Sequence, residues 1–157
     1  MNFKEQEAFV AAMACNMATA HEGAANVTMR SGRSNRIAGA SGFLHQIDVS
    51  VHTETDLVLY ECKYWGVNVD PEAVLAFAAR GGDIQRAHPH YAVSLNVVVS
   101  QALSPGAQQL AQAFGIKCFV VKSAAEFRVG YKTDWAAGTV DQVTLTESAK
   151  ADLRPKR

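Results

Sequence analysis

Three charged residues lie close together in two apolar runs of the sequence. Asp48 falls at the end of the run 42–49, and Glu61 and Lys63 belong to the run 57–63. Two carboxylates, a backbone carbonyl and several waters can bind a hard divalent cation, and a lysine can hold a water or neutralise an oxyanion. Hydrolysis of a phosphodiester requires these parts. The residue types and their spacing therefore predict a centre for metal-dependent phosphodiester hydrolysis.

Both runs have the length and the Val, Ile, Leu and Tyr content of β-strands. The polar segment 52–56 between them is short enough for a hairpin connection, which brings Asp48 beside Glu61. Because side chains alternate along a strand, Glu61 and Lys63 share one face. We expect the carbonyl of Cys62 to be the backbone ligand. Mg²⁺ is the expected ion because it takes few protein ligands, and Mn²⁺ is expected to substitute for it.

Helix and strand patterns alternate through the rest of the chain. Asp70-Pro71 and Ser104-Pro105 are helix starts with a side-chain cap and a proline at the first position. Gly81-Gly82 is expected to interrupt or end the helix that begins at Pro71, with a resumed helix over 83–88, closed by Pro89, as one alternative. The patterns predict, in chain order, a helix over 3–20, a strand over 26–30, a flexible basic loop over 31–41, the two strands named above, a helix over 71–80, a strand over 93–100, a helix from Ser104 to Gly115 and a strand over 116–121.

A single domain over residues 1–157 is expected, because a chain of 157 residues buries roughly 70% of its unfolded surface without crosslinks. The first half is predicted to be a helix and a meander, and the second half a crossover unit with parallel strands. The core is expected over about 3–121. The segment 122–157 is expected to be peripheral, with a short helix near 123–127, a strand near 128–131 and a frayed basic tail.

This element order, with an Asp on one strand and Glu-x-Lys on the next, resembles the PD-(D/E)XK nuclease superfamily. Over about residues 5–121 it looks like the Mrr-type restriction endonuclease catalytic domain. The likeness is carried by Gly-Ala-Ser-Gly-Phe-Leu-His-Gln-Ile-Asp-Val at 39–49, Glu-Cys-Lys-Tyr-Trp at 61–65, and Leu-Ser-Pro-Gly-Ala at 103–107 ahead of Gly-Ile at 115–116. The resemblance implies an α/β, restriction-endonuclease-like core of order αβββαβ followed by a further helix and strand, with a central mixed sheet flanked by helices.

The resemblance also implies roles for individual residues. Asp48 and Glu61 are metal ligands and Lys63 is the catalytic lysine. The family commonly places a Glu on the first helix, near the metal. Glu5 and Glu7 both qualify by helical angle, since they lie symmetrically on either side of the apolar stripe. The family pattern favours Glu7, which is followed by apolar residues two, three and six positions later.

Other polar residues are candidates for contacts with the substrate. The arginines of the basic loop are expected either to contact DNA phosphates or to lie in solvent. The His-Gln pair before Asp48 either orients it, contacts phosphate or makes structural hydrogen bonds. Gln101 ends a buried strand at the edge where α/β sheets bind ligands, with a loop amide as the alternative. These candidates are Arg30, Arg33, Arg36, His45, Gln46 and Gln101.

Composition narrows the class of protein. Fifteen basic and fifteen acidic residues give a formal net charge of zero, which predicts modest affinity for DNA, so a homodimer or a partner protein that supplies specificity is expected. Cys15, Cys62 and Cys118 have the spacing of neither a disulfide framework nor a zinc site. The N-terminus lacks the pattern of a signal peptide and no stretch is long enough to span a membrane, so a cytoplasmic protein is expected.

The expected function is a Mg²⁺-dependent, restriction-endonuclease-like DNA endonuclease of the Mrr type. One alternative is a structure-selective nuclease that resembles Holliday-junction resolvases, for which a dimer with two active centres is expected. An alternative of another class is a catalytically silent module for DNA binding or assembly. Metal-dependent cleavage separates the enzymes from the silent module, and branched DNA separates the two nucleases.

Overall fold

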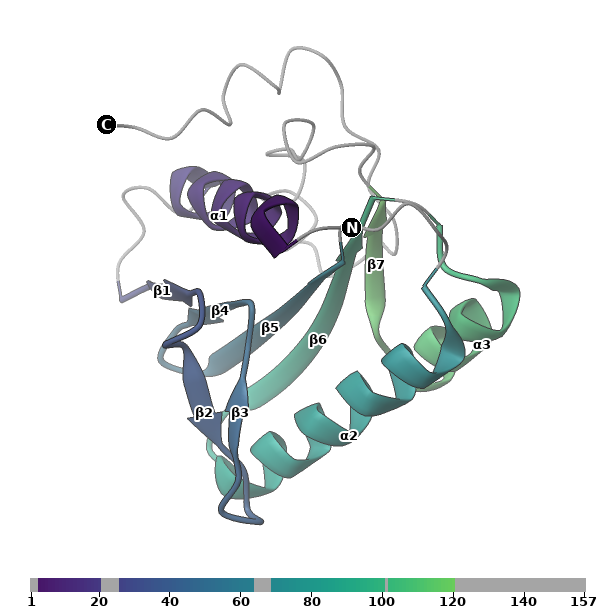
Figure 1. Cartoon of the computed structure of the whole chain (residues 1–157). Helices are drawn as coiled ribbons and strands as arrows, with labels where there is room; N and C mark the ends of the chain where they lie inside the picture. The colour runs from purple at the N-terminus through teal and green to yellow at the C-terminus, as the bar shows by residue number, and fades with distance from the viewer. Residues whose placement is uncertain (1–2, 21–25, 64–68, 101, 121–157) are drawn as a thin grey trace.

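The computed structural model describes residues 3–20, 26–63, 69–100 and 102–120. They form a five-stranded mixed sheet of order β1-β4-β5-β6-β7, with α1 on one face and α2 and α3 on the other (Figure 1). The predicted fold class, a central mixed sheet flanked by helices, is confirmed. The elements are α1 Phe3–Ala20, β1 Thr28–Ser31, β2 Arg36–Ala38, β3 Leu44–Gln46, β4 Val49–His52, β5 Asp56–Lys63, α2 Pro71–Ala87, β6 Ala92–Val99, α3 Pro105–Ala113 and β7 Lys117–Val120.

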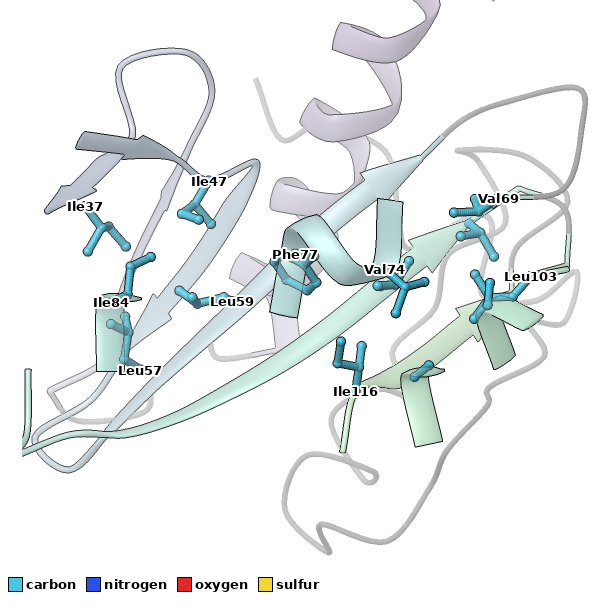
Figure 2. Close-up of a cluster of buried hydrophobic side chains, with 14 residues drawn as sticks. Ile37, Ile47, Leu57, Leu59, Val69, Val74, Phe77, Ile84, Leu103 and Ile116 are labelled. Atoms are coloured by element: carbon cyan, nitrogen blue, oxygen red, sulfur yellow. The ribbon is translucent and has the colours of Figure 1, made fainter. Parts of the chain in front are cut away.

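Each face of the sheet has its own hydrophobic core, because side chains alternate along β5. Val58, Tyr60 and Cys62 pack toward α1. Leu57 and Leu59 pack toward α2 and α3 (Figure 2). The same alternation places the side chains of Glu61 and Lys63 on the α2 face, as predicted for a pair two residues apart.

The first helix follows its prediction over the whole range Phe3–Ala20. Phe9 and Met13 are fully buried against the sheet, and Val10 and Ala14 are almost so. Burying a Phe or Met side chain stabilises a fold by about 1.5–3 kcal/mol, so this stripe fixes α1 on the sheet. It thereby also fixes Glu7, which precedes the stripe.

The prediction that Gly81-Gly82 interrupts or ends the second helix is wrong. The helix α2 runs unbroken from Pro71 to Ala87, with the predicted cap at Asp70. Gly81 is buried against β6, where a Cβ would lie only 2.6 Å from Leu95 side-chain atoms. Each helical glycine costs about 1 kcal/mol relative to alanine, and close packing of the helix on the sheet offsets that cost here.

The prediction of one strand over 42–49, preceded by a flexible loop over 31–41, is also wrong. The chain forms a separate two-stranded sheet in which β2 and β3 are antiparallel, and the strand of the main sheet begins only at Val49. Asn35 is buried where this hairpin begins, and its amide donates to the carbonyl of Ile47 and to Ser50 Oγ, both at 3.0 Å. This buried amide fixes the bend between β3 and β4.

The second half follows the predicted crossover pattern. β5, β6 and β7 are parallel, and α2 and α3 connect them on one face. α3 has the predicted Ser104 cap, and Gly115 follows its C-cap Phe114 with a φ of 68°. Cys15, Cys62 and Cys118 are thiols that are not joined in disulfides. None of the helices in the described ranges is long and apolar enough to cross a membrane. The candidate Gln101 and the elements predicted beyond 122 lie outside the described residues.

Candidate active site

Asp48 lies directly before β4, opposite the end of β5. The register of the two strands pairs Val49 with Tyr60, so the next position pairs Asp48 with Glu61, as the sequence predicts. Asp48 Oδ2 accepts a hydrogen bond of 2.9 Å from the backbone N–H of Cys62. In an extended strand the N–H and C=O of one residue point to the same side, so the Cys62 carbonyl also faces the edge of β5 on which Asp48 lies.

Glu61 lies between two cationic side chains. Its Oε1 is 2.9 Å from Lys63 Nζ, and its Oε2 accepts a hydrogen bond of 3.0 Å from Arg80 Nη1. The Glu61 side chain is only 12% exposed, so these contacts are poorly screened by solvent. Together they hold the carboxylate in one orientation at the C-terminal end of β5.

Arg80 is a site residue that the sequence interpretation missed. It comes from α2, three residues after Phe77 and four before Ile84, both of which are buried. A charged residue at such a position lies on the buried stripe of its helix and requires a partner. That spacing was the signal in the sequence that could have identified it.

The carboxylates of Asp48 and Glu61 repel each other when both are ionised. Burial, followed by the negative charge of Glu61, raises the pKa of Asp48 to about 6. The Cys62 N–H and the charges of Lys63 and Arg80 act in the opposite direction and are outweighed. Repulsion between neighbouring carboxylates is what a divalent cation relieves. The pair therefore fits a hard cation.

The donor set also indicates which cation fits. In the described part of the chain, no group of three or more His, Cys, Asp or Glu side chains is arranged to hold a metal ion. A cation here would rest on Asp48, Glu61, a backbone carbonyl and waters. Mg²⁺ accepts such a set because it retains several of its waters, whereas a structural zinc site requires four protein ligands.

The structure separates the two rival glutamates of the first helix. Glu7 and Asp48 line one cavity of about 300 Å³ between α1 and the chain around β1 and β3, and Glu5 does not contribute to it. Glu7 Oε1 is 3.4 Å from Arg33 Nε, and both side chains are more than half exposed. The cavity is lined by Glu7, Val10, Ala11, Ser31, Gly32, Arg33, Gln46 and Asp48.

The remaining candidates divide between the cavity and its surroundings. Gln46 and Arg33 line the cavity, and Gln46 Nε2 lies 3.4 Å from Asp48 Oδ1. His45 makes a structural contact instead, because its Nε2 is 2.7 Å from Asp83 Oδ2 on α2. Arg30 and Arg36 are exposed on β1 and β2 and do not line the cavity. The sequence interpretation also missed Asp83.

Comparison with known proteins supports the fold. No protein-family model and no curated protein matches the sequence. A repair endonuclease from Pyrococcus abyssi is similar in structure, with a TM-score of 0.51 and 18% sequence identity over 75% of this chain and 47% of that chain. The chain shares its fold with a repair endonuclease. A protein of unknown function is also similar, with a TM-score of 0.56 and 18% identity over 73% of this chain and 58% of that chain. The chain thus spans about half the length of these structures.

Proposed function

We propose that this protein is a Mg²⁺-dependent DNA endonuclease of the restriction-endonuclease-like, Mrr-type class. The observation that carries the proposal is the meeting of Asp48, Glu61 and Lys63 at the ends of two paired strands. Two carboxylates with a neighbouring ammonium form a set suited to binding a cation and an anionic phosphate together. The fold shared with a repair endonuclease supports the same conclusion.

The chain's own groups divide the work. Asp48, Glu61 and the Cys62 carbonyl would hold the cation, which supplies Lewis-acid activation of a phosphate and a water when bound. Lys63 carries a positive charge beside Glu61, where it can orient the attacking water or neutralise the phosphorus oxygens. Glu7 contributes a second carboxylate to the cavity that Asp48 lines.

Arg80 positions Glu61. Without it, the ammonium of Lys63 would be the cation left in contact with this carboxylate among the described residues. With it, one oxygen of Glu61 faces the guanidinium and the other faces Lys63. The guanidinium is a rigid, planar hydrogen-bond donor, so it holds the Glu61 carboxylate in one orientation. Lys63 can then turn toward a substrate without leaving a buried charge unpaired.

A cleavage assay tests the proposal. Wild-type protein should cut duplex DNA with Mg²⁺ or Mn²⁺ and not with EDTA. Asp48→Asn and Lys63→Ala should each lower kcat by about 100- to 1,000-fold, the loss typical of removing a group that stabilises charge in the transition state. The matched control is Glu72→Gln, an exposed acid at the start of α2, which should leave the rate unchanged.

The choice of substrates makes the assay decisive. Methylated and unmethylated duplexes, a four-way junction and an RNA duplex should be compared at equal concentrations. Preferential cutting of the junction would indicate a structure-selective nuclease. Failure to cut any of them with either metal would refute the enzymatic proposal, and DNA binding without products or metal dependence would indicate a silent binding module.

A further inference from the structure

The tip of the β2–β3 hairpin, residues 39–44, carries an exposed apolar pair. Phe43 is 65% exposed and Leu44 is 53% exposed. Among the described residues, the other exposed large hydrophobic side chains are Leu75 at 44% and Phe114 at 52%, and they are not neighbours in sequence. The hairpin projects beyond the edge of the main sheet and reaches the C-terminal end of α2 (Figure 1). Two large apolar side chains at a projecting tip have no role in either core.

Asp83 of α2 holds this tip firmly. Its carboxylate accepts hydrogen bonds from the Ser41 N–H at 3.0 Å and from Ser41 Oγ at 2.6 Å, and it lies 2.7 Å from His45 Nε2. Its backbone carbonyl accepts from the N–H of Ala40. Gly39 passes so close to Asp83 that no side chain would fit there. The tip is therefore a braced loop.

The aromatic ring at the tip is also held in place. The centroid of the Phe43 ring lies 5.0 Å from that of His45, at an interplanar angle of 59°. The backbone of Phe43 accepts from the Gly39 N–H at 3.0 Å and donates to Ser41 Oγ at 3.2 Å. A side chain that is already ordered loses little conformational entropy when it binds. Phe43 is thus a preorganised apolar group directed at solvent.

The chain that leads into the tip is basic. From residue 27 to residue 47 the sequence contains Arg30, Arg33 and Arg36 and no acidic residue, in a chain with a net charge of zero. Arg36 is exposed on β2, paired across the hairpin with Gln46. In the fold, Glu7 lies beside Arg33 and Asp83 braces the tip, so the exposed Arg30 and Arg36 are the charges of this segment that would attract DNA phosphates.

The tip is also close in the chain to Asp48, the candidate catalytic carboxylate. Asp48 is five positions after Phe43 in the sequence. At about 3.3 Å per position the two residues are at most about 17 Å apart, which is the length of about five base pairs at about 3.4 Å each. A duplex that contacts both Asp48 and the tip would therefore do so within about five base pairs.

We propose that the hairpin tip is a DNA wedge, in which Phe43, supported by Leu44, inserts against the bases near the scissile phosphate and unstacks a base step. This rests on the proposed nuclease function. Other DNA-binding proteins insert apolar side chains between base steps and unstack and kink the duplex in this way. A dimer contact is the weaker alternative, because stable interfaces bury about 1,200–2,000 Å², far more than two side chains supply.

The experiment uses duplex DNA with 2-aminopurine at successive positions within five base pairs of the cleavage site, because its fluorescence rises when the base unstacks. Binding of the Asp48→Asn protein should raise the fluorescence several-fold at one step. The rise should disappear in Asp48→Asn/Phe43→Ala and persist in Asp48→Asn/Phe114→Ala, which removes an equally large exposed aromatic elsewhere. Circular dichroism confirms that each variant is folded.

The outcomes separate the wedge from the nuclease. Wild-type cleavage of the same DNA, with no fluorescence rise or with a rise that Phe43→Ala retains, would overturn the wedge and leave the nuclease intact. Failure of the wild type to bind or cut DNA would overturn both. Sedimentation analysis adds a check, since a dimer that Phe43→Ala converts to a monomer would assign the tip to self-association and refute the wedge.

Discussion

Removal of Arg80 tests whether the orientation of Glu61 matters for catalysis. The Glu61 side chain is only 12% exposed in the wild type, and in Arg80→Ala it loses the hydrogen bond of 3.0 Å from the guanidinium. A hydrogen bond between charged groups contributes about 1.5–3 kcal/mol, and the loss of a comparable amount from the transition state lowers kcat by about 10- to 100-fold. Lys63 would then be drawn to Glu61 and away from the substrate.

The assay measures kcat and KM for DNA cleavage at saturating Mg²⁺, with urea unfolding in parallel. Arg80→Lys should recover part of kcat because it retains the charge but not the planar fork. Arg86→Ala is the control on the same helix, since its side chain is 68% exposed and its ion pair at 3.5 Å contributes little. Wild-type kcat in a folded Arg80→Ala protein would refute the positioning role, as would equal losses in the Ala and Lys variants.

Two further predictions concern stability. Without a divalent cation, the free energy of unfolding should fall by up to about 3 kcal/mol as the pH rises from about 4 to above 6, because the folded pKa of Asp48, about 6, lies above its ordinary value of 3.8. Urea titrations at several pH values should show that the free energy of unfolding changes less with pH in Asp48→Asn, and in wild type with Mg²⁺. An unchanged pH dependence in Asp48→Asn would contradict the assignment of this effect to Asp48. Asn35→Ala should lower the free energy of unfolding by about 1–3 kcal/mol through lost buried hydrogen bonds, and a change below about 0.5 kcal/mol would contradict the bracing role of this amide.

The sequence by itself determined the elements whose causes are local. The Asp70-Pro71 and Ser104-Pro105 starts specify two helices through a cap and a fixed φ, and both are observed. Glu61 and Lys63 share a face because strands have a period of two, and a short connection is enough to bring Asp48 opposite Glu61. The core of the candidate site was therefore predictable from residues within about one hairpin.

The tertiary structure decided the contacts between residues distant in sequence. Arg80 reaches Glu61 across 19 residues, and Ser41 reaches Asp83 across 42. Local propensity predicted a loop over 31–41. The β2–β3 hairpin forms there because it is held by hydrogen bonds to α2, a helix much later in the chain, which local propensity cannot reveal. Gly81 likewise breaks helices in isolation and is helical here because it packs against β6. Local patterns carry no information about such partners, since packing and buried polar groups set their pairing only after the elements meet.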